Sequence, residues 1–175
     1  SYRLTKWNMK NYKKISRFVI TSGAGPGIMA AANQGAMEAG GKTIGLGISL
    51  PFEEKNNRWI TKGLNFVFHY FFMRKFWFIY LTKGIVVWPG GFGTLDELFE
   101  AINLIQTNKV EKFPIILVGS EYWEGIIDWI KKTLLLENNH ISKEDLNLFK
   151  IADTKEEVMN FLEEFHNNYK FSPNF

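Results

Sequence analysis

The sequence predicts an α/β fold in which parallel strands alternate with helices, and three observations support this prediction. Short, nearly continuous apolar runs alternate with longer helical stretches along most of the chain. Glycine-rich loops follow two of these runs and lead directly into helical stretches. The 175 residues are 46% hydrophobic and 16% aromatic, which supplies a substantial core. We therefore expect a Rossmann-like, doubly wound parallel sheet flanked by helices, in one domain spanning residues 1–175.

Six apolar runs are the predicted strands. Their nearly continuous apolar character is typical of strands that are covered on both faces in a parallel sheet. The runs are Arg17–Thr21, Lys42–Ile48, Asn65–His69, Gly84–Trp88, Pro114–Val118 and Phe149–Ala152.

Five stretches between and after these runs are the predicted helices. Gly40 and Gly41 end the first, because glycine readily adopts the left-handed conformation that follows a helix. Thr154 and Glu157 have the spacing of a capping box at the start of the last. The helices are Gly27–Ala39, Phe71–Thr82, Thr94–Thr107, Tyr122–Glu137 and Lys155–Tyr169.

The beginning of the chain departs from this alternation. Only a basic, helix-like piece, Leu4–Ser16, precedes the first predicted strand. Because a doubly wound sheet normally opens with a strand, we expect the opening strand to be missing, either through truncation or in an absent upstream segment. The net charge of +3 is too small to indicate a nucleic-acid partner, so we interpret the basic residues as a solvated helix face.

Composition also argues against several kinds of site. With no cysteine and three widely separated histidines, the chain offers no disulfide, no thiolate nucleophile and no local metal-ligand motif. The most apolar stretch, Phe66–Leu81, contains Arg74 and Lys75 and is shorter than the ~20 apolar residues of a membrane span. We predict that it forms a buried strand and a buried helix. No secretion signal is visible, so we expect a cytoplasmic protein with no metal and no membrane partner.

The first glycine-rich loop, residues 21–29, follows a predicted strand and contains Gly25 at its centre. Its glycines are spaced G-x-G-x-G, which is not the dinucleotide-binding pattern. A tight turn between strand and helix explains it about as well as ligand binding does.

The second loop runs through Gly90, Gly91, Phe92 and Gly93 and again follows a predicted strand. Its backbone N–H groups and the positive end of the following helix favour a phosphate. No lysine follows the glycines, so the loop is not a Walker A motif. Thr94 and Glu97 match either a capping box or a catalytic pair, and this local pattern does not choose between them.

Arg74 and Lys75 are the only formal charges in an aromatic stretch. An unpaired charge in a buried helix is costly. One of these side chains either extends to the surface or lines a polar pocket, where the guanidinium of Arg74 pairs with a carboxylate or phosphate. We favour the pocket.

Three segments, SGAGPGIMAAANQGAMEAGGKTIGLGISLP, HYFFMRKFWF and PGGFGTLDELFEAINLIQT, resemble the Lonely Guy family. The resemblance implies a phosphoribohydrolase that cleaves nucleoside 5′-monophosphates, such as AMP or a cytokinin riboside monophosphate. It also implies a homodimer, with the active site near the subunit interface, and no cofactor. Older usage labels many members lysine decarboxylases.

The resemblance implies roles for individual residues. Arg74 and Glu97 match catalytic positions, and Lys75 matches a binding lysine. The remaining implied contacts to substrate or phosphate are Gly25, Glu53, Gly90, Gly91, Phe92, Gly93, Thr94 and Asn103. Asn103 stands where the family usually has threonine, and Ala24 and Ala30 replace a usual glycine and glutamate.

Three alternatives remain beside hydrolysis. The first is a nucleotide-binding sensor module without turnover. The second is a decarboxylase with pyridoxal phosphate, for which no lysine lies in a matching setting. The third is a nicotinamide-dependent enzyme, for which the glycine spacing is wrong and no acidic residue ends the second strand.

Overall fold

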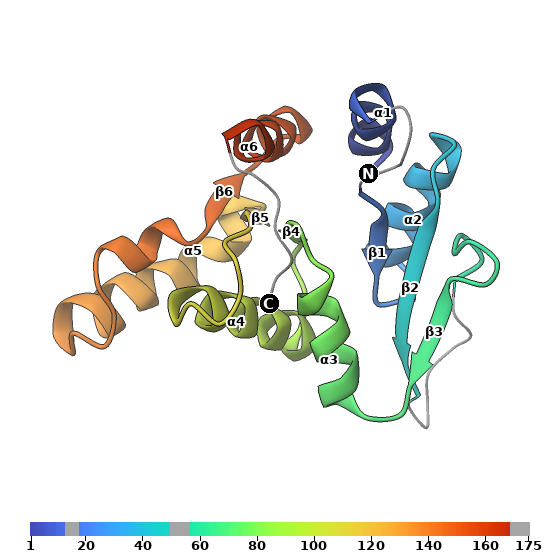
Figure 1. The fold of residues 1–175 in the computed structure, drawn as a ribbon. Coiled ribbons are helices and arrows are strands. Elements are labelled where there is room, and N and C mark those ends of the chain that lie inside the picture. Colours follow the sequence, from blue (N-terminus) through green and yellow to red (C-terminus); the bar gives the residue numbers. More distant parts are fainter. Residues whose placement is uncertain (13–17, 50–56, 169–175) are drawn as a thin grey trace. The chain divides into compact units, whose positions relative to one another are not determined.

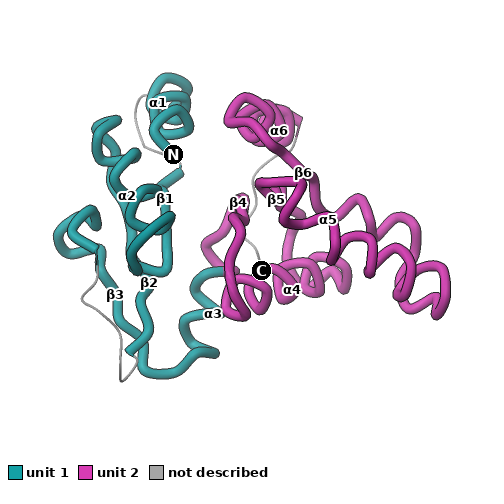
Figure 2. The backbone as a smooth tube through the Cα atoms, turned by 180° about the vertical axis from the view of Figure 1, so that it is seen from behind, with its two compact units in different colours: residues 1–78 teal, residues 79–175 magenta. Residues whose placement is uncertain are grey.

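A computed structural model describes residues 1–12, 18–49 and 57–168 of the chain. Its contacts divide the chain into two compact units, Ser1–Phe78 and Ile79–Phe175 (Figure 2). Each unit contains parallel strands flanked by helices, so the predicted α/β class is confirmed. The single domain stays a prediction, and the two units are described separately below.

The first unit is built on a three-stranded parallel sheet in the order β1-β2-β3 (Figure 1). Its central strand has a neighbour on each side and is therefore buried along nearly its whole length. Helix α1 packs on α2, and α2 packs on β1 and β2. The elements are α1 (Tyr2–Asn11), β1 (Ile20–Ser22), α2 (Ile28–Glu38), β2 (Thr43–Ile48), β3 (Asn65–Phe68) and the greater part of α3 (Phe71–Tyr80).

The second unit repeats this plan with the parallel order β4-β5-β6, which Figure 1 shows in green, yellow and orange. Val87 pairs with Leu117, and Leu117 pairs with Ile151. Helix α5 packs on β5, and α6 packs on β5 and β6. The elements are β4 (Ile85–Val87), α4 (Phe92–Gln106), β5 (Ile115–Val118), α5 (Ser120–Trp129), β6 (Lys150–Ala152) and α6 (Lys155–Asn168).

The core of the second unit surrounds Trp123, which is fully buried. Apolar side chains of β4, α4, β5 and α5 pack with it. Its indole Nε1–H donates to the carbonyl of Val118 at 3.0 Å, so the one polar atom of the ring is satisfied inside the core. This contact fixes the first turn of α5 to the end of β5.

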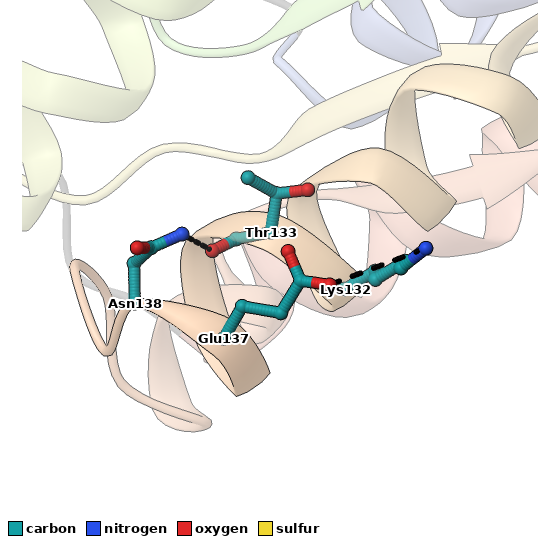
Figure 3. Close-up of polar contacts among 4 residues, drawn as sticks. All are labelled: Lys132, Thr133, Glu137 and Asn138. Atoms are coloured by element: carbon teal, nitrogen blue, oxygen red, sulfur yellow. Dashed lines mark hydrogen bonds and ion pairs between the residues drawn. The ribbon is translucent and has the colours of Figure 1, made fainter.

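The predicted helix over Tyr122–Glu137 divides into two parts. An α-helix ends at Trp129, and a π-helix continues over Ile130–Glu137. Just beyond it, the Asn138 side chain donates to the carbonyl of Thr133 at 2.8 Å, five residues back, and the Lys132 ammonium lies 4.0 Å from the Glu137 carboxylate (Figure 3). A short 3₁₀-helix, Glu144–Asn147, follows before β6.

The apolar stretch Phe66–Leu81 is more exposed than we predicted. Within the described residues β3 is an edge strand, so it lacks a neighbour on one side. Phe72 is 67% exposed, and Ile79 is the one fully buried residue of α3. The prediction of a buried strand and helix is therefore wrong. None of the described helices combines the length and the apolar character that crossing a membrane requires.

Candidate functional site

The second glycine-rich loop connects β4 to α4, and the start of this helix differs from the prediction. The helix begins at Phe92, and Gly91 is its N-cap. The N–H groups of Thr94 and Leu95 donate to the Gly91 carbonyl at 3.0 and 3.1 Å. Thr94 is therefore the third helical residue rather than the cap, because Gly91 already adopts the extended conformation of an N-cap. The alternative that Thr94 and Glu97 form a capping box is wrong.

The same T-x-x-E pattern does form a capping box at α6. The Glu157 N–H donates to Thr154 Oγ1, and the Thr154 N–H donates to Glu157 Oε2, both at 3.2 Å. Here the threonine lies immediately before the helix, where the box requires it. Because Thr94 lies inside α4 rather than at its N-cap, Thr94 and Glu97 do not form the corresponding box.

The loop glycines fall into two groups. A Cβ on Gly90 would lie 2.2 Å from the Thr94 hydroxyl, so close packing requires glycine there. A Cβ on Gly91 or Gly93 would meet nothing within 4 Å. The space beside these two residues is open, and a ligand can approach their backbone closely.

The three helices that follow the strands of the second unit differ at their N-termini. Asp153 accepts the Ser120 N–H of α5 at 2.6 Å, and Glu157 caps α6. The hydrogen bond from Ser120 lowers the pKa of the Asp153 carboxyl below its ordinary value, so this group is charged at neutral pH. The N-cap of α4 makes no side-chain cap hydrogen bond, and its first turn carries no acidic residue. Among the described residues, α4 is thus the one of the three helices whose N-cap and first turn hold no carboxylate.

Glu97 lies one turn further along α4. Residues three and four apart share a helix face, so Glu97 lies on the same face as Gly93 and Thr94. Four residues span about 6 Å along the axis, and helical side chains tilt towards the N-terminus. The Oε2 atom of Glu97 is buried in a half-buried side chain. The carboxylate of Glu97 is therefore about one helical turn from the glycine-rich loop, a separation that a ribose can span.

Arg74 and Lys75 lie on α3 in the first unit and are both half-buried. The guanidinium of Arg74 lies 5.7 Å from the ring centre of Phe71 and 5.6 Å from that of Phe78. These rings lie on the same helix face, three residues before and four residues after it. The Nε of Arg74 is buried, and the pocket interpretation of this side chain stays a prediction.

The first glycine-rich loop is held by a polar network that the sequence did not reveal. Ser22 donates to buried Asn33 at 2.6 Å. The side chain of Asn57 donates to the carbonyls of Ala24 and Gly25, each at 3.1 Å. Ala24, which stands where the family usually has glycine, is fully buried with a φ of 68°. Its backbone is in the left-handed region that glycine favours, so this substitution carries local strain.

The predicted site residues are therefore distributed over both units. Gly90–Thr94 and Glu97 are together at the start of α4, and Asn103 lies about 13 Å further along the helix than Thr94. Gly25, Arg74 and Lys75 belong to the first unit, and Glu53 lies outside the described residues. The substrate contacts of all these residues stay predictions.

Two polar residues of the second unit were missed in the sequence. Asp153 follows β6 directly, and a carboxylate at the end of a predicted parallel strand was a signal that could have been noticed. Tyr122, whose hydroxyl donates to the Gly90 carbonyl at 2.5 Å, gave no such signal, because the two residues are 32 positions apart.

Comparisons with known proteins bear on the family and on the fold of this chain. A bifunctional cytokinin biosynthesis protein of Fusarium pseudograminearum (strain CS3096) is 30% identical over 82 residues, which are 47% of this chain and only 16% of that protein. The structure of a molybdenum cofactor binding protein from Rippkaea orientalis superposes with a TM-score of 0.62 at 20% identity, covering 94% of this chain and 85% of that one.

A structural-genomics target, TM1055, superposes with a TM-score of 0.59 at 23% identity, covering 93% of this chain and 85% of that one. At these identities the two structures establish the fold alone. Residues 29–162 match the family described as "Possible lysine decarboxylase". The chain therefore belongs to this family, which is the Lonely Guy family that its motifs resemble.

Proposed function

We propose that the protein hydrolyses the N-glycosidic bond of nucleoside 5′-monophosphates, releasing a free base and ribose 5-phosphate. The observation that carries the proposal is the start of α4. An open glycine-rich helix N-terminus lies one turn from Glu97, which does not form a capping box with Thr94. Family membership and the cytokinin biosynthesis relative support a nucleotide-directed activity.

The 5′-phosphate is proposed to bind at the N-terminus of α4. Helix N-termini favour anions through their free N–H groups and the helix dipole. The corresponding ends of α5 and α6 already hold carboxylates. Binding of the phosphate, which is remote from the reacting bond, helps to orient the ribose for reaction.

Glu97 is proposed to act on the attacking water. The transition state of glycosidic cleavage carries positive charge at the anomeric carbon, which a nearby carboxylate stabilises. As the bond from the anomeric carbon to the base nitrogen breaks, water adds to that carbon and Glu97 accepts its proton, while the departing base, which keeps the electron pair of the broken bond, takes up a proton from solvent. We assign to Arg74 the cationic role, neutralising substrate charge and assisting departure of the base.

Comparing AMP with adenosine tests this proposal. The purified protein is incubated with each compound, and released adenine is measured by chromatography. We expect adenine from AMP and far less from adenosine, because adenosine lacks the phosphate that orients the ribose. Equal release from both would contradict the phosphate site, and AMP binding without release would favour the sensor module.

Gly93→Ala is expected to separate stability from ligand binding. Alanine favours a helix over glycine by up to about 1 kcal/mol, so the free energy of unfolding should not fall. Its methyl group enters the open space beside α4, where the phosphate is proposed to bind. We expect the affinity for AMP, measured by titration calorimetry, to fall at least tenfold.

Gly125→Ala in α5 is the matched control, because a Cβ there also meets nothing within 4 Å. It should leave AMP affinity unchanged. Unchanged affinity in the Gly93→Ala protein would contradict the proposed phosphate position.

We also propose that the protein forms a homodimer through the exposed aromatic surface of β3 and α3. This surface includes Phe66, Tyr70, Phe71, Phe72 and Phe76, each at least 47% exposed. Contiguous exposed apolar patches on soluble proteins commonly mark interaction sites. The proposed interface uses only residues of the first unit.

Phe72→Asp is expected to convert the dimer to a monomer, because it places a charge inside the proposed contact. Light scattering should give twice the chain mass of 20.3 kDa for the unmodified protein and a single chain mass for the variant. Leu136→Asp, at a 70% exposed position of the π-helix, is the control and should stay dimeric. A monomeric unmodified protein would refute the proposed dimer.

A further inference from the structure

Tyr122 links α5 to the glycine-rich loop. It is the third residue of α5, and its hydroxyl donates to the carbonyl of Gly90. The Tyr122 side chain is 49% exposed, so core packing alone does not explain the position of its hydroxyl. The hydroxyl is placed where it can hold one particular peptide group of the loop.

Holding this carbonyl also sets the direction of a donor. The described residues contain no cis peptide bond, and in a trans peptide the C=O and the following N–H point in opposite directions. Because the Gly90 carbonyl is directed to Tyr122, the N–H of Gly91 is directed away from it. Gly91 is the N-cap of α4, beside the open space described above.

The loop benefits from this hydrogen bond because two consecutive glycines flank the peptide that it holds. Gly90 and Gly91 have wide conformational freedom, so the peptide between them can rotate at little steric cost. A rotated peptide would turn the N–H of Gly91 away and point a carbonyl oxygen at the incoming anion. A hydrogen bond to the Gly90 carbonyl favours the productive orientation before the ligand arrives.

Tyr122 is well suited to this task because its own position is fixed. The neighbouring residue, Trp123, is fully buried and hydrogen-bonded to the Val118 carbonyl. The first N–H of α5 is held by Asp153. Tyr122 therefore lies in the first turn of α5, which hydrogen bonds connect to the last residue of β5 and to Asp153, the residue after β6.

We infer that Tyr122 is a positioning residue that orients the Gly90–Gly91 peptide for phosphate binding. This inference rests on one part of the proposed function, namely that the N-terminus of α4 binds the phosphate group of a ribose phosphate. It concerns binding rather than the chemical step, so it predicts an effect on affinity and on KM rather than on kcat.

Tyr122→Phe tests the inference, because it removes the hydroxyl and keeps the ring. The dissociation constant for ribose 5-phosphate is measured by titration calorimetry, and KM and kcat are measured with AMP. We expect the dissociation constant and KM to rise about 3- to 10-fold, the worth of one hydrogen bond, with kcat changed less than twofold. The measurements are made where circular dichroism shows both proteins folded.

Tyr2→Phe is the matched control, since Tyr2 is similarly exposed at 47%. It should change none of these values. An unchanged dissociation constant in Tyr122→Phe, a loss confined to kcat, or no binding of ribose 5-phosphate by the unmodified protein would overturn the inference. If the protein binds ribose 5-phosphate but releases no adenine from AMP, the hydrolase proposal is refuted. The comparison of the dissociation constants for ribose 5-phosphate would still decide the role of Tyr122.

Discussion

Glu97→Gln is expected to lower kcat for AMP hydrolysis by roughly 10²- to 10⁴-fold, the usual contribution of a general base. Glutamine has nearly the same shape but neither accepts the proton of water nor offsets positive charge at the anomeric carbon. Because the phosphate is proposed to bind one turn away, the dissociation constant for AMP should change less than about threefold. Single-turnover kinetics and calorimetry measure the two quantities separately.

The neighbouring Asp96 offers a matched control for this prediction. Asp96 is exposed on the same helix, so Asp96→Asn removes the same charge without touching the proposed chemistry. It should retain near-normal kcat. Equal losses of kcat and affinity in Glu97→Gln, or a similar loss of kcat in Asp96→Asn, would argue against a catalytic carboxylate.

Trp123→Ala is expected to reduce the free energy of unfolding by about 3–5 kcal/mol, as is typical for truncating a buried tryptophan. The ring lies at the centre of the second unit's core and is fully buried. The substitution also leaves the Val118 carbonyl without the indole donor. Urea denaturation monitored by circular dichroism measures the change.

Trp129→Ala on the same helix is the control for this second prediction. Trp129 is 52% exposed, and surface substitutions usually change stability by no more than about 0.5 kcal/mol. A comparable loss in both variants would show that the core of the second unit does not centre on Trp123. Trp123→Phe should give an intermediate loss, because it keeps most of the ring volume but not the hydrogen bond.

The strands were predictable because burial leaves a local record in the sequence. The runs at Lys42–Ile48 and Pro114–Val118 became the central strands β2 and β5, which are covered on both sides. The edge strand β3 has the same apolar character but is mostly exposed. The composition of a segment indicates whether it can be buried. Whether it is buried depends on the neighbouring elements that the tertiary structure places against it.

The candidate site was only partly predictable for a related reason. The glycine-rich loop and its helix follow from local spacing, but T-x-x-E is ambiguous until the first helical residue is known. The helix begins at Phe92 rather than at the predicted Thr94, because Gly91 adopts the extended conformation of an N-cap. The contact between Tyr122 and Gly90 and the network around Asn33 and Asn57 join residues distant in sequence. No local pattern records such contacts.

The most direct test of the central claim is to quantify adenine and ribose 5-phosphate together after incubating the unmodified protein with AMP. Hydrolysis of the N-glycosidic bond predicts that both products appear in equal amounts and that Glu97→Gln forms neither at a comparable rate. Absence of adenine under conditions where AMP binds would contradict the claim.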